Sequence, residues 1–345
     1  MRHPPLAPGW IDRPHQRLDL GSMRLESGEV LQDAFVSYVV HGNASRLQDA
    51  AILVTTAIGS THHRLDFLIG PGKALDTDKF AIVVADAIGN GLSISPSNSP
   101  RQHGAAFPRF TIRDMVTSQH MLLDHLGIGR LEAVVGASMG GMQALQWGVS
   151  HPQRMAALVA MTPMARTSRW SQLVNEMSRR ALFLDPACRL PRQRDDAMHL
   201  WVPLTQLVMS RTPGALESFE SQAQLTQWLD AQAMLLGQDG PDPFDWCYQS
   251  WAYDAHDVGT TASFAGDTAA ALRSIEAPTL VLVPTLDLYN PPQAGHAVID
   301  ATPKARYVGL PGEWGHASAS GIDPVTTDVI SGALRDFLAR TPGSC

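Results

Sequence analysis

The 345-residue sequence predicts an α/β fold with a mostly parallel sheet of eight strands. Short apolar runs bounded by Gly, Pro or Asp recur along the chain, and most are separated by segments long enough to form a helix. One run passes through a Gly-rich turn into a helix-forming segment at residues 131–147. A long stretch without strand signals, residues 165–262, interrupts the alternation.

The first two apolar runs are predicted to form a hairpin. They cover residues 17–25 and 35–41, flank a turn-like Ser-Gly-Glu, and form the one antiparallel pair expected in the sheet. The other six runs are continuously apolar, as expected of strands covered by helices on both faces. They are residues 51–55, 80–85, 131–135, 155–161, 279–283 and 306–310.

Residues 165–262 are expected to form a helical lid inserted into a core made of residues 1–164 and 263–345. Apolar residues recur at helical spacing in this segment, for example at residues 172–184 and 222–236. Large aromatic side chains in a helical segment either line a ligand cavity or pack one helix on another, and packing is the more common role. Both interpretations apply to the five tryptophans of this segment, which are Trp170, Trp201, Trp228, Trp246 and Trp251.

The composition indicates a globular protein and disfavours two classes of partner. Charged residues make up 17% of the chain and the formal net charge is -7, so the dense positive charge that nucleic acids require is absent. No apolar run reaches the length of a membrane span, and residues 1–10 lack the apolar core of a signal peptide. We therefore expect a cytoplasmic protein without a nucleic-acid or membrane partner. The three cysteines, Cys188, Cys247 and Cys345, are expected to be free thiols.

The segment at residues 131–147 is typical of a nucleophile elbow. An apolar strand runs into Gly-Ala-Ser-Met-Gly, a G-x-S-x-G motif, and then into a helix-forming run. Gly136 and Gly140 are needed because side chains there would collide with the neighbouring strand and helix. The turn would lift the Ser138 hydroxyl above the sheet and leave the Met139 N–H free to donate to an oxyanion. This context predicts the α/β-hydrolase fold with Ser138 as nucleophile, the alternative being a simple Gly-rich turn.

A serine nucleophile needs a base, and in this fold an acid and then a histidine follow the serine along the chain. Asp287, in the loop after the run at 279–283, is the expected acid, and a turn-capping aspartate is the alternative interpretation. His316 lies in a Gly-flanked loop after the last strand and is the expected base. Asp86 would be an alternative acid, but it precedes the serine and breaks this order.

The remaining histidines, of 13 in the chain, are expected to be ordinary. His62 and His63 are adjacent, so their rings are expected to point apart, without the i, i+4 spacing of a helical metal pair. Neither His256 nor His296 is expected to act as the base. We expect no metal site, and no nucleotide or nicotinamide cofactor, because the sequence has no complete phosphate-binding glycine motif.

The second oxyanion donor of this fold comes from the loop after an early strand. That loop reads Leu-Val-Thr-Thr-Ala-Ile-Gly-Ser at residues 53–60. Ile58 or Ala57 is expected to donate its N–H there. The same small residues would also suit an ordinary turn.

The sequence resembles the homoserine O-acetyltransferase family nearly end to end. The segments that carry the resemblance are residues 69–77, 89–97, 110–116, 136–145 and 254–259. The resemblance implies an α/β-hydrolase fold with Ser138, Asp287 and His316 as a catalytic triad. It also implies that Ile58 completes the oxyanion hole and that residues 165–262 form a lid through which two copies associate as a homodimer.

One departure from the family pattern concerns the acceptor. In the true transferases an aspartate that holds the amino group of homoserine typically follows the active-site histidine, whereas Ala317 follows His316 here. The expected lid arginine is not evident at residues 244–248, and Arg166 is the remaining candidate to face the site. The departure favours a hydrolase that acts on a small-molecule acyl substrate. Acyl transfer from an acyl-coenzyme A to an alcohol or amine, and ligand binding without turnover, are the alternatives.

Overall fold

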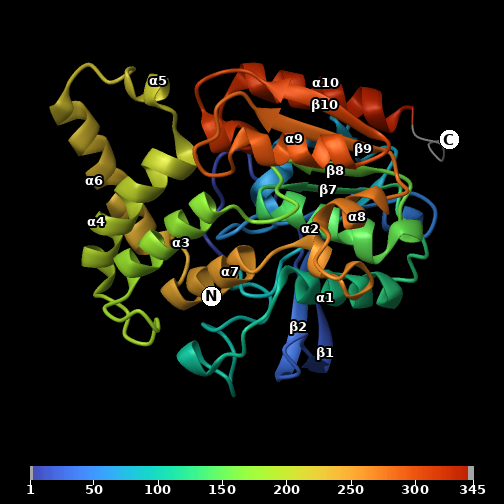
Figure 1. Cartoon of the computed structure of the whole chain (residues 1–345), viewed down its shortest axis with the longest axis horizontal. Helices are drawn as coiled ribbons and strands as arrows, with labels where there is room; N and C mark the ends of the chain where they lie inside the picture. The colour runs from blue at the N-terminus through green and yellow to red at the C-terminus, as the bar shows by residue number, and fades with distance from the viewer. Residues whose placement is uncertain (1–2, 341–345) are drawn as a thin grey trace.

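An eight-stranded sheet forms the centre of the computed structural model, which describes residues 3–340 (Figure 1). The strand order is β1-β2-β6-β3-β7-β8-β9-β10. Each predicted run corresponds to one of these strands, so the predicted α/β fold is confirmed. The strands are β1 (Gln16–Arg24), β2 (Val30–His41), β3 (Ala51–Thr55), β6 (Ala81–Ala85), β7 (Ala133–Ala137), β8 (Leu158–Met161), β9 (Thr279–Pro284) and β10 (Ala305–Leu310). Two very short strands, β4 (Ile69–Gly70) and β5 (Leu75–Asp76), pair separately.

Two predictions about the sheet were wrong. β2 is antiparallel to both of its neighbours, β1 and β6, so the sheet has two antiparallel pairs where one was expected. The reason is the strand order: β2, the second strand of the β1–β2 hairpin, pairs with β6, the strand at the edge of the parallel part of the sheet. β10 is not buried along its length, and Tyr307 is 44% exposed. It is an edge strand paired only with β9, so less of its surface is covered.

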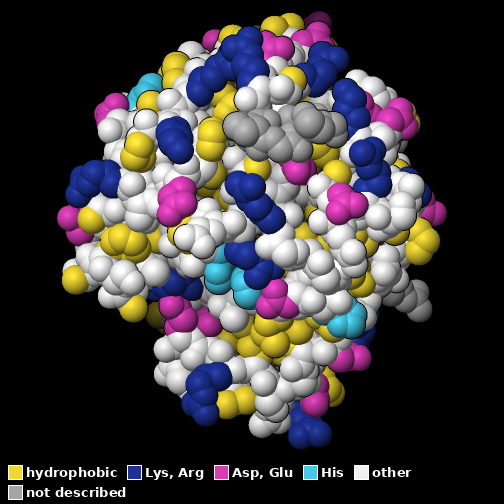
Figure 2. Space-filling view, turned by 90° about the vertical axis from the view of Figure 1, so that its right-hand side faces the viewer, with side chains coloured by type: hydrophobic (Ala, Val, Ile, Leu, Met, Phe, Trp, Pro, Cys, Tyr) yellow, Lys and Arg dark blue, Asp and Glu magenta, His cyan; other side chains and the backbone are white. Residues whose placement is uncertain are grey.

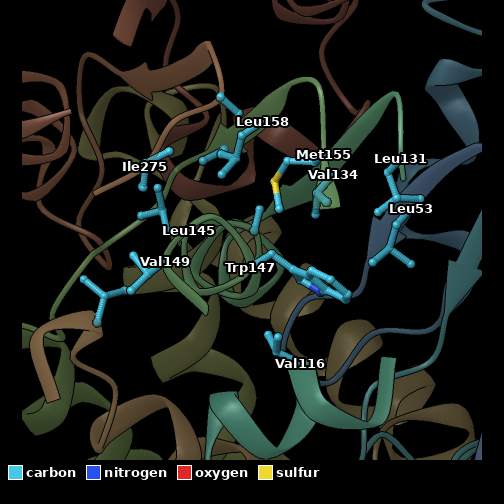
Figure 3. Packing of buried hydrophobic residues seen from close by; sticks show 14 of the residues in the cluster. Leu53, Val116, Leu131, Val134, Leu145, Trp147, Val149, Met155, Leu158 and Ile275 are labelled. Atoms are coloured by element: carbon cyan, nitrogen blue, oxygen red, sulfur yellow. The ribbon is translucent and has the colours of Figure 1, made fainter. Parts of the chain in front are cut away.

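Helices cover both faces of the sheet (Figure 1). On one face lie α1 (Ile112–His125), α2 (Met139–Ser150), α8 (Thr268–Arg273) and α9 (Pro292–Ala301). On the other lie α10 (Pro324–Leu338) and the 3-10 helix η2 (His62–Leu68). Successive side chains of a strand alternate between the two resulting cores, as Leu53 does with Ile52. This alternation explains why the central strands are apolar throughout. Figure 3 shows the first core, where Trp147 extends from α2 between Leu53 and Val116.

Residues 165–262 are mainly helical and lie beside the sheet, at the left in Figure 1. The helices are α3 (Arg169–Leu182), α4 (Arg194–Thr205) with its π-helical continuation η5 (Gln206–Ser210), α5 (Pro213–Leu216), α6 (Gln222–Asp239) and α7 (Pro243–Asp254). Trp201 and Trp246 are buried with ring centroids 5.7 Å apart. These two tryptophans therefore pack helix on helix, which is the use the sequence favoured. Within residues 3–340, no helix is long and apolar enough to cross a bilayer.

Short helical turns connect the main elements. They are η1 (Ala44–Arg46), η3 (Gly104–Ala106), η4 (Pro152–Arg154), η6 (Val258–Thr260), η7 (Ala262–Phe264) and η8 (Gly315–Ser320). Cys188 and Cys247 are buried free thiols, as expected, and Cys345 lies outside the described residues. On the face opposite the α3–α7 helices, acidic and basic side chains both occur among the described residues (Figure 2).

Candidate active site

Ser138 lies on the sharp turn between β7 and α2. Its backbone has φ 58° and ψ -124°, a conformation that costs energy for any residue other than glycine and that occurs mostly at functional sites. The glycines on either side permit the turn. A Cβ atom on Gly140 would lie 2.5 Å from the carbonyl oxygen of Thr55, and one on Gly136 would collide with the Gly140 carbonyl. The predicted elbow geometry is therefore present.

The structure brings Ser138, His316 and Asp287 together in one chain of hydrogen bonds. The Ser138 hydroxyl donates to His316 Nε2 at 2.7 Å, and His316 Nδ1–H donates to Asp287 Oδ2 at 2.8 Å. All three residues are at most 6% exposed. His316 lies in η8, and Asp287 lies in the loop after β9. The arrangement allows the imidazole to take the serine proton while the carboxylate fixes its tautomer.

Asp287 both caps its turn and orients the histidine. Its Oδ1 accepts the backbone N–H groups of Tyr289 and Asn290, each at 2.8 Å. These two bonds hold the carboxylate so that Oδ2 meets the imidazole. The two interpretations that the sequence left open for Asp287 are therefore not exclusive.

The two expected oxyanion donors, the N–H groups of Ile58 and Met139, lie in segments that a hydrogen bond connects. Thr55 Oγ1, at the end of β3, donates to the Gly140 carbonyl at 2.8 Å, which fixes the Ile58 loop beside the elbow. The next N–H of that loop, on Gly59, donates to Gln249 Oε1 at 2.9 Å. Within residues 3–340, neither Ile58 nor Met139 uses its N–H in a protein hydrogen bond. For Met139 this follows from its place at the first position of α2, where an N–H has no intrahelical partner.

Tyr253, at the end of α7, is a further residue near the triad, because its partner Asn290 donates its backbone N–H to Asp287, and the sequence reasoning missed it. Its hydroxyl donates to Asn290 Oδ1, and the Asn290 amide in turn donates to the Thr162 carbonyl at 2.7 Å. Burial raises the pKa of Tyr253 well above its usual value, and the hydrogen bond to Asn290 opposes this shift. The hydroxyl therefore stays protonated as a donor. Nothing in the spacing of Tyr253 distinguishes it from the other aromatic residues of its helix.

The other residues weighed as base or acid lie elsewhere. His296 packs its ring against Tyr307. Burial, together with the charge of Arg113, lowers the pKa of His256 to about 3. Asp86 Oδ2 accepts from His62 Nδ1 at 3.0 Å and so belongs to a different histidine.

The structure does not bring Arg166 to the serine. Its side chain is exposed, and it lines a surface hollow of 730 Å³ together with Ala297 of α9. The buried arginine of the 165–262 segment is Arg179, which the sequence reasoning missed, and Asp254 pairs with it at 2.8 Å. Ala317 lies in η8 directly after His316 and adds only a methyl group there.

The expectation that His62 and His63 point apart was wrong. Their ring centroids are 4.2 Å apart, because both residues lie in η2, where buried carboxylates hold each Nδ1. His3 approaches the same place, and the three residues have ring nitrogens that all lie within 4.8 Å of one another. A histidine cluster that the sequence did not reveal therefore follows the Ile58 loop.

A cavity of 520 Å³ lies between the loops that carry these residues. Gly59 and Ser60 of the Ile58 loop line it, as do Ser320 and Gly321, which end the His316 turn. Further lining comes from the 165–262 segment and from the N-terminal arm, here defined as residues 3–15. A small molecule bound there would lie next to both loops.

Known proteins with similar sequences and structures share the fold of this chain. A family model described as the alpha/beta hydrolase fold matches residues 59–189. A homoserine O-acetyltransferase from Methanosalsum zhilinae is 39% identical over 181 residues, 48% of this chain but only 37% of that protein's length. One from Moorella thermoacetica is 29% identical over 335 residues, 85% of this chain and 88% of that protein.

Among solved structures, the acetyl esterase MekB superposes with a TM-score of 0.86 and 28% identity, covering 94% of this chain and 97% of that one. The predicted α/β-hydrolase fold and the predicted resemblance to homoserine O-acetyltransferases are thereby confirmed.

Proposed function

Because the chain is an enzyme of the α/β-hydrolase fold, we propose that it is a serine hydrolase that cleaves an ester or related acyl bond of a small molecule. One observation carries the proposal: the buried chain of hydrogen bonds from Asp287 through His316 to Ser138. Such a chain activates a hydroxyl that is otherwise a weak nucleophile near neutral pH. It also disfavours the alternative of a ligand-binding protein without turnover.

In the first step, Ser138 Oγ attacks the substrate carbonyl carbon while its proton passes to His316 Nε2. The N–H groups of Ile58 and Met139 donate to the oxygen, which gains negative charge as the carbonyl becomes tetrahedral. Collapse of this intermediate breaks the acyl bond, and the leaving group takes the proton from His316. The products of this step are an acyl-enzyme and a free alcohol or thiol.

In the second step, His316 removes a proton from a water molecule that attacks the acyl carbon. The same two N–H groups stabilise the second tetrahedral intermediate. Its collapse returns the proton to Ser138 Oγ and releases a carboxylic acid.

An O-acyltransferase is the second candidate, and the names of the curated relatives favour it. It would form the same acyl-enzyme from an acyl-coenzyme A and pass the acyl group to an alcohol or amine. The methyl group of Ala317 offers no charge to an ammonium group of the acceptor, and Arg166 lies exposed away from the triad. Arg179 is paired with Asp254, so its charge is already satisfied. These features support water as the acceptor.

We also propose that residues 165–262 act as a lid and as the surface of a homodimer. Nine of the 15 exposed large hydrophobic side chains in the described part of the chain belong to this segment, among them Trp170, Leu173 and Met177 of α3. Exposed apolar side chains concentrated in one segment favour burial against another surface. Sedimentation equilibrium of the full chain should give twice the mass of the 37.3 kDa chain. A monomer at micromolar concentration would contradict the dimer.

The function is tested with p-nitrophenyl acetate and with acetyl-coenzyme A, each with and without homoserine. Nitrophenol release and free thiol are followed, and Ser138→Ala serves as the control. If the chain is a hydrolase, its rate of ester cleavage will be the same with and without homoserine. Thiol release that depends on homoserine would instead identify a transferase. If Ser138→Ala were as active as the natural chain, both candidates would be wrong.

A further inference from the structure

Four histidines gather where the N-terminal arm meets η2. His3 Nε2 lies 2.9 Å from His63 Nε2, and the rings of His3 and His62 stack with centroids 5.3 Å apart. The ring of His15 lies 4.5 Å from that of His62. Residues 3, 15 and the pair at 62 and 63 are distant in sequence, so only the fold brings them together.

Buried carboxylates orient two of these rings. His62 Nδ1 lies 3.0 Å from Asp86 Oδ2, and His63 Nδ1 lies 2.6 Å from Asp66 Oδ2. Both aspartates are 1% exposed. Asp86 is itself held by Ser37 Oγ at 3.1 Å and by the amide of Asn90 at 2.8 Å. A carboxylate that accepts Nδ1–H leaves a lone pair on Nε2, which is how metal-binding histidines are commonly prepared.

Within residues 3–340, the Nε2 atom of His62 lacks the hydrogen-bond partner that a buried polar atom normally has. His62 is 1% exposed, and its Nε2 has no hydrogen-bond partner among the described residues. An unpartnered buried nitrogen is unfavourable and calls for an explanation. The Nε2 of His63 meets another ring nitrogen, that of His3, and a proton between those two would still leave His62 unsatisfied. A cation shared by all three rings would satisfy every one of them.

We propose that His3, His62 and His63 bind one divalent transition-metal ion through their Nε2 atoms, and that Zn²⁺ fits the site best. Three imidazoles suit Zn²⁺ and its neighbours in the first transition row, whereas Mg²⁺ and Ca²⁺ prefer oxygen. Tetrahedral Zn–N bonds of about 2.0–2.1 Å separate ligand nitrogens by roughly 3.4 Å. One ring nitrogen of each histidine already lies within 4.8 Å of the other two, and His3 Nε2 lies 2.9 Å from His63 Nε2, so small ring movements suffice. Water or His15 would complete the coordination.

The ion would fasten the arm to the core beside the candidate active site. Trp10 stacks on His63 with ring centroids 4.3 Å apart, and the Ile11 N–H donates to Asp66 Oδ2 at 2.8 Å. The arm residues Pro4, Pro8 and Trp10 form one wall of the 520 Å³ cavity that the Ile58 and His316 loops also line. The role assigned to the metal is therefore structural, and this inference does not depend on the proposed hydrolase activity.

Metal titration of the full chain tests the site directly. The protein is freed of metal with a chelator, dialysed, and titrated with Co²⁺, whose visible absorption reports tetrahedral coordination, and then with Zn²⁺. We expect one Co²⁺ per chain and its displacement by one equivalent of Zn²⁺. Absence of the visible band, or less than one ion per chain, would overturn the proposal.

Variants identify the ligands. His3→Ala should weaken Zn²⁺ binding at least 10-fold, and Asp86→Asn should weaken it about 10- to 100-fold because it releases the His62 ring. His125→Ala is the matched control, since His125 is an exposed histidine at the end of α1, and should bind as the natural chain does. Equal affinity in His3→Ala and the natural chain would contradict the site. An unchanged Zn²⁺ affinity in Asp86→Asn would also contradict the site, because it would mean that His62, whose ring Asp86 orients, is not a ligand.

Thermal unfolding gives an independent measurement. An ion that binds only the folded chain raises Tm. Excess Zn²⁺ should therefore raise the Tm of the natural chain and of His125→Ala, and it should leave the Tm of a folded His3→Ala variant unchanged. An equal rise in all three proteins would show binding elsewhere and would refute the assignment.

Discussion

Two buried Asp–His pairs lie at the same edge of the sheet, yet their surroundings suit them to different chemistry. Asp287 follows β9 and holds His316 at 2.8 Å, while Asp86 follows β6 and holds His62 at 3.0 Å. In both pairs Nδ1 meets the carboxylate. The Nε2 of His316 faces Ser138, whereas that of His62 has no hydrogen-bond partner among the described residues and the His62 ring packs against those of His3 and His15. A carboxylate only prepares an imidazole, and the group at Nε2 decides whether it moves a proton or binds a metal.

The largest expected effect separates the two pairs. Asp287→Asn should lower kcat by about 10⁴-fold, because the amide favours the wrong imidazole tautomer. Asp86→Asn changes the carboxylate that holds the other histidine, His62. Its loss of kcat, measured per folded molecule, should be at least 100-fold smaller than that of Asp287→Asn. Ester cleavage measured on variants matched by circular dichroism checks this. Comparable losses in both would mean that the two pairs share one function.

A smaller effect is expected from Tyr253, which borders only the first pair. Tyr253→Phe removes the hydroxyl that donates to Asn290, whose backbone N–H holds Asp287, and it should lower kcat about 10-fold with little change in KM. Tyr248→Phe is the control, since its hydroxyl donates to the Ala105 carbonyl. If both variants lost the same activity, the effect would reflect packing and Tyr253 would have no positioning role.

Asp245 sharpens the comparison because it is a buried aspartate without a histidine. Burial and the charge of Asp242 raise its pKa to about 7, against hydrogen bonds from Ser97 that lower it. The folded chain thus binds this proton more tightly than the unfolded chain, so stability should fall as pH rises from about 4 to 7.

Asp245→Asn keeps a side chain of the same size and shape but removes the carboxyl group that binds the proton. Between pH 5 and pH 8 its Tm should therefore decline by a few degrees less than that of the natural chain. The comparison of the two proteins cancels the other titrating groups. Parallel Tm curves would mean that Asp245 does not hold a proton in the folded chain.

The smallest effect is expected at residue 317, next to His316, where a carboxylate could bind the amino group of an acyl acceptor. Ala317→Asp places a carboxylate next to His316 and should add a homoserine-dependent component to thiol release from acetyl-coenzyme A. We expect a gain of only a few-fold, because Arg166 lies away from the site. Thiol release that still ignored homoserine would mean that this position alone does not select the acceptor.

The sequence predicted the first pair and missed the second for physical reasons. Ser138 sits in a local motif whose glycines are required by sterics, and chain order in a parallel sheet then points to Asp287 and His316. The second site depends on a contact between His3 and η2, across nearly 60 residues, which no local pattern encodes. For the same reason the antiparallel pairing of β2 with β6 was missed, since register and neighbours arise only when the sheet assembles.

The central claim is that Ser138 is the nucleophile, and covalent labelling tests it most directly. The natural chain is treated with a fluorophosphonate, digested, and the modified peptide is sequenced by mass spectrometry, with Ser138→Ala treated in parallel. We expect one adduct, on Ser138, and no labelling of the variant. An adduct on any other residue, or equal labelling of Ser138→Ala, would contradict the account.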